Sequence, residues 1–170
     1  MGKVECELED VMDETYGNLS PGLLLASVGK NGEKNIMTIG WGLIGVLFRK
    51  PAFMVAVRKS RHTYKLINET GVFTVNVPGE GMDEALDFCG TKSGRDHDKF
   101  KELNLTAKKS ETVEAPIVEE CKIHFECRVM SATDVTVTGT TKEVLESVYP
   151  NKNYHRLYHG EILKIYRDET

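Results

Sequence analysis

The sequence has no long apolar run and no excess of positive charge, and each absence excludes a class of protein. No stretch is apolar for long enough to span a bilayer, and the opening residues MGKVECELED lack the apolar core of a secretory signal. The net charge of −4 argues against general binding of nucleic acids or acidic membranes, because both require a broad positive field. We therefore expect a cytoplasmic protein with neither nucleic-acid nor membrane partners.

Cysteine is also scarce, and the four cysteines do not have the spacing of a metal site. Cys121 and Cys127 lie in CKIHFECRV, a segment whose alternating apolar residues predict a strand. Six residues apart, they would share one face of that strand, while His124 points to the other. The chain has no C-x-x-C pair. We expect free thiols, as is usual in the cytoplasm, and no metal.

No repeat, low-complexity tract or linker divides the chain, so residues 1–170 are expected to form one domain. Strands are predicted at 23–29, 35–47, 52–58, 72–78, 121–130 and 154–168, and short helices after residue 60 and at 81–90, 96–103 and 142–148. Strands interrupted by short helices favour a mainly β fold, a closed antiparallel barrel with helices at its ends. The stretch GWGLIG lacks the glycine spacing of a dinucleotide-binding loop, which excludes a Rossmann fold.

The segment VRKSRHTYKLINETG, residues 57–71, gathers cations and hydroxyls where a helix is predicted to begin. Ser60 is a favourable N-cap, and Gly71 is expected to end the helix. Free N–H groups at the positive end of the helix dipole bind phosphate well. Arg61 would add bidentate hydrogen bonds, and Thr63 would add a hydroxyl. The segment alone is equally compatible with a solvated helix start that Ser60 merely caps.

Four segments, in order, resemble the flavin reductase-like family of FMN-binding split barrels. They are NIMTIGW (35–41), PAFMVAVRKSRHTYKLINETGVFTVNVP (51–78), FCGTKSGRDHDKF (88–100) and YHRLYHGEIL (154–163). In the last segment a histidine, His155, stands five residues before a Gly-Glu pair, as in the family. The resemblance extends from about residue 15 to 166. It implies a Greek-key split barrel, related to flavoredoxins, that forms a homodimer and holds FMN near the subunit interface.

The resemblance also implies which residues bind the cofactor. Met37, Thr38, Ile39 and Gly40 would line the isoalloxazine edge, Arg58, Ser60, Arg61 and Thr63 would hold the phosphate, and Ser93, Gly94 and Lys99 would lie near the phosphate or ribityl chain. Trp41 would stack on or near the ring, although a core aromatic is as good an interpretation of it. The residues themselves agree in part, because Gly40 and Gly42 allow a flat ligand to approach the backbone closely. Lys99 alternatively belongs to the first turn of a surface helix.

The family's histidine lies beside the flavin, where the electron donor or another substrate is received, so the resemblance assigns this place to His155. Its imidazole would bond the incoming molecule in either charge state near neutral pH. His155 and His159 would share one face of the predicted strand, and the alternative is that both merely lie on an edge strand.

The resemblance implies an NAD(P)H-dependent oxidoreductase of the flavin reductase type, in which NADH or NADPH reduces FMN. Free flavin, a ferric chelate or an electron-acceptor protein would then take the electrons. No catalytic acid or base is required. The alternative is a flavoredoxin-type electron carrier without nicotinamide oxidase activity. An enzyme resembling pyridoxamine-phosphate oxidases is a third possibility, but it would need a second cationic site. The sequence departs from the family pattern in two places. RKPAF stands where the family often has two prolines, and the helical segment 142–148 would reshape the mouth of the site. The second departure leaves the identity of the electron acceptor undetermined.

Overall fold

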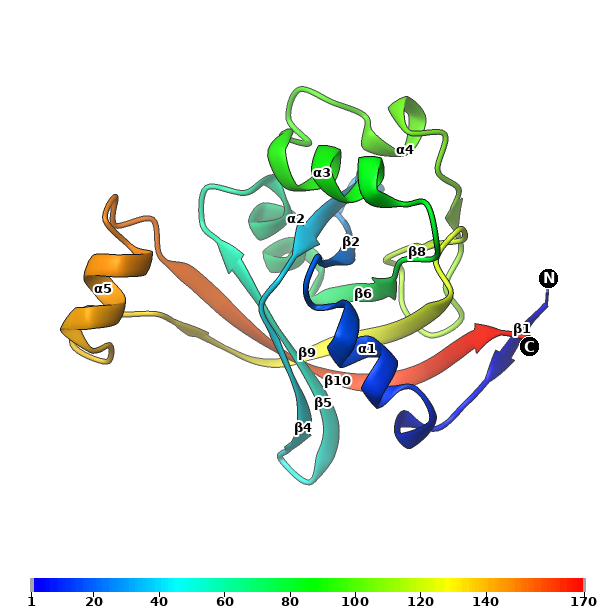
Figure 1. Cartoon of the computed structure of the whole chain (residues 1–170), viewed down its shortest axis with the longest axis horizontal. Coiled ribbons are helices and arrows are strands. Elements are labelled where there is room, and N and C mark those ends of the chain that lie inside the picture. The colour runs from blue at the N-terminus through cyan, green and yellow to red at the C-terminus, as the bar shows by residue number, and fades with distance from the viewer. Residues whose placement is uncertain (1, 170) are drawn as a thin grey trace.

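The computed structural model describes residues 2–169, which form an antiparallel sheet that curls into a split barrel (Figure 1). Its strands follow the order β3-β2-β6-β9-β10-β5-β4, and β1 pairs with the end of β10. The bounds are β1 Lys3–Glu5, β2 Leu23–Val28, β3 Lys34–Ile39, β4 Gly42–Leu47, β5 Lys50–Arg58, β6 Val72–Val77, β9 Ile123–Asp134 and β10 His155–Asp168. A separate two-stranded sheet joins β7 (Ala107–Lys108) to β8 (Ile117–Val118). The predicted mainly β fold is confirmed.

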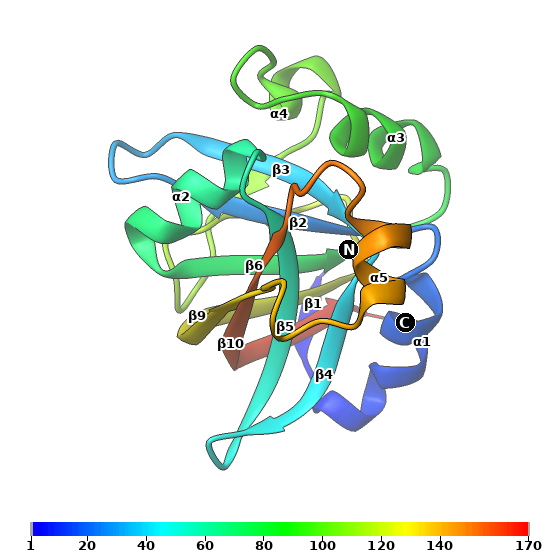
Figure 2. The same ribbon diagram turned by 90° about the vertical axis from the view of Figure 1, so that its left-hand side faces the viewer.

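Short helices cover the barrel and extend from it. They are η1 Leu8–Asp10, α1 Met12–Asn18, α2 His62–Thr70, α3 Asp83–Thr91, α4 Lys99–Glu102 and α5 Lys142–Val148. Figure 2 shows α3 and α4 lying over β2 and β3, whereas α5 stands at the far end of β9 and β10. Within residues 2–169, every helix is too short or too polar to cross a membrane.

Two sequence predictions about local structure are wrong. The strand expected at 35–47 is two strands, because the chain leaves β2 at Ile39 and begins to pair with β5 only at Gly42. Helix α2 begins at His62 with Arg61 as its N-cap, because the Ser60 hydroxyl accepts a hydrogen bond from Asn153 Nδ2 (2.8 Å) instead of capping the helix. The end of α2 at a left-handed Gly71 is confirmed (φ 70°).

The apolar core lies inside the barrel, where the phenylalanines of three strands meet. Phe53, Phe73 and Phe125 are completely buried, and the rings of Phe53 and Phe125 pack edge to face at 5.2 Å. The core leaves little room for a side chain at Gly42, because a Cβ there would lie 3.0 Å from Phe53 Cε1. A second apolar layer fills the space between the outer face of β2 and β3 and the helices α3 and α4.

The 14-residue strand β10 changes direction at Gly160. Its register against β9 shifts between His159 and Gly160 and again between Ile162 and Lys164. A Cβ on Gly160 would lie 2.5 Å from Phe73 Cζ and 3.0 Å from Cys127 Cβ, so the Phe73 ring occupies the space of the missing side chain. Residues 155–161 of β10 pair with β5, and its last residues pair with β1.

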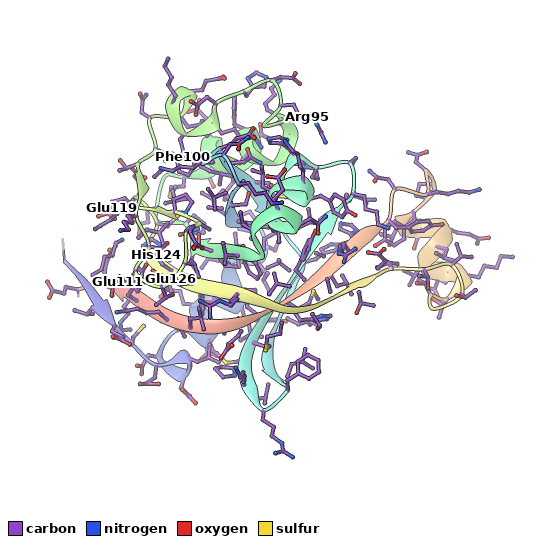
Figure 3. All side chains as sticks on the ribbon, turned by 180° about the vertical axis from the view of Figure 1, so that it is seen from behind. Arg95, Phe100, Glu111, Glu119, His124 and Glu126 are labelled. Atoms are coloured by element: carbon purple, nitrogen blue, oxygen red, sulfur yellow. The ribbon has the colours of Figure 1, made fainter. Side chains whose placement is uncertain are left out.

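A polar cluster is buried on β6 and β9, at the end remote from α5 (Figure 3). The Asn76 amide oxygen binds His124 Nδ1 (2.8 Å) and also accepts a hydrogen bond from the Val118 backbone (3.1 Å). Beside it, the buried Glu126 carboxylate accepts hydrogen bonds from the backbone of Glu111 and Thr112 and from the Tyr166 hydroxyl. Burial is the main reason that the pKa of His124 falls to about 3.

We predict that Gly160→Ala destabilises the protein by about 1–3 kcal/mol, because the new methyl group would overlap the Phe73 ring. Gly17→Ala is the matched control, since Gly17 lies on the exposed helix α1 and a Cβ there meets no atom within 4 Å. The control is expected to gain about 0.5–1 kcal/mol from the lower entropy of the unfolded chain. Urea unfolding at one fixed protein concentration measures both. Equal midpoints for the two variants would show that the Gly160 contact does not constrain the fold.

We also predict that His124 makes stability depend on pH. The imidazole is neutral in the folded protein and takes up a proton on unfolding at lower pH. Its contribution to the free energy of unfolding is therefore fully present above the ordinary histidine pKa of about 6.5. It is then lost, by up to about 1.4 kcal/mol per pH unit, as the pH falls toward 4. His124→Gln should reduce this slope in denaturation curves taken between pH 7 and 4. A slope that the substitution leaves unchanged would contradict the prediction.

Candidate functional site

A cavity of about 250 Å³ opens where the barrel fails to close. It is lined by Met37, Thr38, Ile39, Gly40, Trp41, Ala56, Arg58, Arg61 and His155. The sheet explains its position, because β4 pairs with β5 only as far as Gly42 and Val55. Residues 56–58 pair with β10 on one side alone, while residues 40 and 41 lie between β3 and β4. The backbone of residues 40 and 41 is thus outside both ladders and faces the cavity.

Two guanidinium groups stand at one end of the cavity. Arg58 Nη1 donates to the Asn153 carbonyl (2.5 Å), and Arg61 donates to the carbonyls of Gly90 (2.8 Å) and Cys89 (2.9 Å). The last two carbonyls belong to the negative end of the α3 dipole, which Arg61 offsets. Burial lowers the pKa of Arg61, but a guanidinium stays charged at neutral pH. Because each guanidinium has five N–H groups, both retain donors for an anion in the cavity.

Aromatic rings form the wall next to Arg58. The imidazole of His155 lies against Trp41, with ring centroids 4.3 Å apart, and its Nδ1 is 2.7 Å from the Tyr149 hydroxyl. Burial, and then the charge of Arg58, lower the pKa of His155 to about 4. His155 is therefore neutral near pH 7, which corrects the expectation that either charge state would occur there. Trp41 is 45% exposed, so it is a wall of the cavity and not a core aromatic.

The other expected site residues lie outside the cavity lining. Thr63 is completely buried, and its hydroxyl accepts a hydrogen bond from Asn35 Nδ2 (3.0 Å) on β3. Lys99 is also buried, its Nζ donates to the carbonyls of Ile36 (2.8 Å) and Cys89 (3.1 Å), and burial lowers its pKa to about 8. Both side chains brace β3 next to the residues that do line the cavity.

Ser60, Ser93 and Gly94 also stand away from the lining. Ser60 is exposed, and its hydroxyl is engaged by Asn153. A Cβ on Gly94 would lie 2.2 Å from Asn35 Oδ1, so this glycine makes room for the asparagine that holds Thr63. The Ser93 hydroxyl accepts a hydrogen bond from the backbone of Arg95 (3.2 Å).

Sequence reasoning missed Tyr149, Asn153 and Ala56. Tyr149 is 5% exposed although it directly follows the exposed helix α5. A signal for it exists, because VYPNKNYH places two tyrosines and two asparagines immediately before His155. Nothing in that segment indicates which side chain turns inward, since the contact with Trp41 crosses more than a hundred residues.

Apolar side chains continue along the same outer face of the sheet. A second hollow of about 310 Å³ is lined by Leu43, Ile44, Gly45, Val46, Leu47, Ala52, Met54, Leu157 and His159. Leu43 is opposite Met54, and Met54 is opposite His159, so three strands contribute one row of side chains. Leu43 is 68% exposed, which leaves this apolar face open to solvent, whereas Val46 lies three residues further along β4 and projects from the other face of the strand.

The described residues do not offer a metal centre. The thiols of Cys6, Cys89, Cys121 and Cys127 are free, and no three His, Cys, Asp or Glu side chains within residues 2–169 are grouped to hold a metal ion. The prediction that Cys121 and Cys127 share one strand face is wrong, because Cys121 lies before β9 and packs on the helix side of the sheet, whereas Cys127 is inside the barrel.

Comparison with known proteins agrees with this geometry. A protein of Archaeoglobus fulgidus without assigned function is 33% identical over 133 residues, which are 78% of this chain and 65% of that protein. This chain thus spans about two thirds of the length of that relative. The flavoredoxin structure from Desulfovibrio vulgaris has a TM-score of 0.69 at 27% identity and covers 87% of this chain and 69% of its own. The flavoredoxin from Methanosarcina acetivorans has a TM-score of 0.69 at 29% identity, covering 87% and 68%.

The family assignment rests on most of the chain. The model of the flavin reductase like domain matches residues 16–170, which include both guanidinium groups, the link at residues 40 and 41 and His155. This protein is a member of the flavin reductase-like family.

Proposed function

We propose that the cavity binds FMN and that the protein is an FMN-dependent oxidoreductase that takes electrons from NADH or NADPH. The observation that supports this most is the cavity lining. In it, two guanidinium groups, the unpaired backbone of residues 40 and 41, and an aromatic wall adjoin one another. The three parts suit the three parts of FMN: an anionic phosphate, a ring edge rich in hydrogen-bonding groups, and a flat aromatic face. Family membership supports the same assignment.

Each wall has a definite role in this proposal. Arg58 and Arg61 would hold the phosphate, and backbone groups from Met37 to Trp41 would hold the ring edge. Thr63 and Lys99 would act indirectly, because they fix β3 from the side away from the cavity. Ser60, Ser93 and Gly94 would stabilise the surrounding loops. When bound, FMN supplies hydride acceptance and electron transfer, while the protein supplies orientation and electrostatics.

The electron donor would enter beside the aromatic wall. A nicotinamide ring would stack on the open face of the flavin, next to Trp41 and His155, and exclude water. Because His155 is neutral at pH 7, it would offer a hydrogen bond without adding a positive charge. Free flavin, a ferric chelate or an acceptor protein would then take the electrons.

An electron carrier without nicotinamide oxidase activity is the second candidate function. The likeness to two flavoredoxins, at 27% and 29% identity, favours it. Both candidates need the same cofactor site. The absorption spectrum of the purified protein, with release of FMN and not FAD, tests the site. Steady-state oxidation of NADH and of NADPH by the FMN-loaded protein then separates the enzyme, which turns over, from the carrier, which does not.

The protein is further proposed to act as a homodimer through the apolar outer face of β4, β5 and β10. The exposed Leu43, in a hollow that Met54 and Leu157 also line, supports a partner there, because soluble monomers rarely expose contiguous apolar surface of this kind. This face adjoins the cavity, so a second copy would stand close to the cofactor.

We predict that Arg61→Ala weakens FMN binding about ten- to a hundredfold, which corresponds to a charged hydrogen bond of about 1.5–3 kcal/mol. Lys59→Ala is the matched control, because Lys59 lies outside the cavity lining and is paired with Asp134 at 2.7 Å. Fluorescence titration with FMN measures both affinities. Since Arg61 also caps α3, the folded fraction of each variant is checked by circular dichroism. If both substitutions weakened FMN binding equally and only slightly, Arg61 would not be a phosphate ligand.

We predict that Leu43→Glu shifts the protein from dimer to monomer, because it places a charge in the centre of the apolar face. Tyr16→Glu is the control, since Tyr16 is also highly exposed (76%, against 68% for Leu43) but lies on α1. Light scattering at micromolar concentration measures the mass of each. A monomeric wild-type protein that still holds FMN would overturn the proposed dimer.

A further inference from the structure

The segment that follows α5 is in contact with three members of the cationic and aromatic walls. The Tyr149 ring lies under the guanidinium of Arg58, whose Cζ is 5.3 Å from the ring centroid. The rings of Tyr149 and Trp41 are nearly perpendicular, with centroids 6.4 Å apart. Asn153 binds Arg58 through its carbonyl and Ser60 through its side-chain amide. Residues 149–153 thus hold the walls of the cavity from outside, although the cavity lining does not include them.

The hydroxyl of Tyr149 has one good acceptor. Burial raises the pKa of Tyr149, so the phenol carries its proton at neutral pH. The hydroxyl proton is then free to point to His155 Nδ1, 2.7 Å away. No other acceptor for this hydroxyl is found within residues 2–169.

A hydrogen bond in this direction fixes the tautomer of the neutral imidazole. If Nδ1 accepts, the ring proton must be on Nε2. Nε2 makes no hydrogen bond to any described residue, and it is not among the buried polar atoms that lack a partner. The ring lines the cavity, so the Nε2–H group is accessible to a ligand.

We propose that Tyr149 is a positioning residue of this site: its hydroxyl keeps His155 as the Nε2–H tautomer, so that the imidazole presents a hydrogen-bond donor to an oxygen of the molecule that enters against Trp41. That molecule is a small planar compound with a carbonyl or carboxamide oxygen. The part of the inference that concerns a ligand rests on the proposed function. The part that concerns the tautomer does not.

The tautomer is measured directly by ¹⁵N magnetic resonance of the full-length protein labelled at histidine, both free of flavin and loaded with FMN. Protonated and unprotonated imidazole nitrogens have distinct shifts, and the His155 signals are assigned by their loss in His155→Gln. Wild type is expected to show a protonated Nε2 and an unprotonated Nδ1. Tyr149→Phe keeps the ring and removes the hydroxyl, so the ratio of the two tautomers should fall by about two- to tenfold.

Tyr154→Phe is the matched control. Tyr154 packs on Tyr149 with ring centroids 5.1 Å apart, but its hydroxyl makes no hydrogen bond to residues 2–169. Its removal should leave the His155 shifts unchanged. A protonated Nδ1 in wild type, or His155 shifts that Tyr149→Phe leaves in place, would overturn the inference. If Tyr149→Phe does not fold, the wild-type spectrum alone decides between the two tautomers.

Kinetics of the FMN-loaded protein test the link from Tyr149 through His155. Tyr149→Phe and His155→Gln are each expected to raise KM for NADH or NADPH more than they lower kcat. The double variant should be no worse than His155→Gln alone, because a residue that acts through another adds nothing after that other is lost. Independent, additive losses would overturn the positioning role. A protein that binds no FMN would instead refute the proposed function and leave the tautomer result standing.

Discussion

The close contact between Gly160 and Phe73 is the constraint on which the rest of the structure depends. Because Phe73 fills the space of a side chain at residue 160, β10 bends there and serves two parts of the sheet. Its first half runs along β5 and brings His155 opposite Arg58. Its second half continues beside β9 to meet β1.

The negative end of α3 connects the helical layer to the cavity. The Cys89 carbonyl accepts hydrogen bonds from both Arg61 and Lys99, which approach it from α2 and α4. Two cations are tolerated close together because they share the electron-rich end of one helix. Lys99, which is the more deeply buried, has its pKa lowered to about 8, mainly by burial, whereas Arg61 keeps its charge and faces the cavity. The packing of the helices thus buries Lys99 and leaves Arg61 as the cation that a ligand in the cavity can reach.

How far the sequence predicts this site depends on how local each contact is. The sequence predicts residues 37–41 and the arginines at 58 and 61 as site residues, because each group lies within one short segment with a recognisable pattern. The break of the strand at 40 and 41 could not be predicted, since it is caused by a change of partner from β2 to β5. Ser60 does not cap the helix as the sequence predicts. Its hydroxyl bonds Asn153, which is 93 residues away and so invisible to local pattern. Tyr149 was missed although its neighbour His155 was found, because its inward orientation depends on Trp41 and Arg58.

The unpaired edge of β5 has a consequence for how the protein would respond to losing its ligand. Residues 56–58 have a neighbouring strand on one side only, so the proposed flavin would take the place that a strand occupies in a closed barrel. Such a molecule completes the wall of the barrel without belonging to the chain. Its departure would leave the barrel's phenylalanine core intact and loosen only this seam.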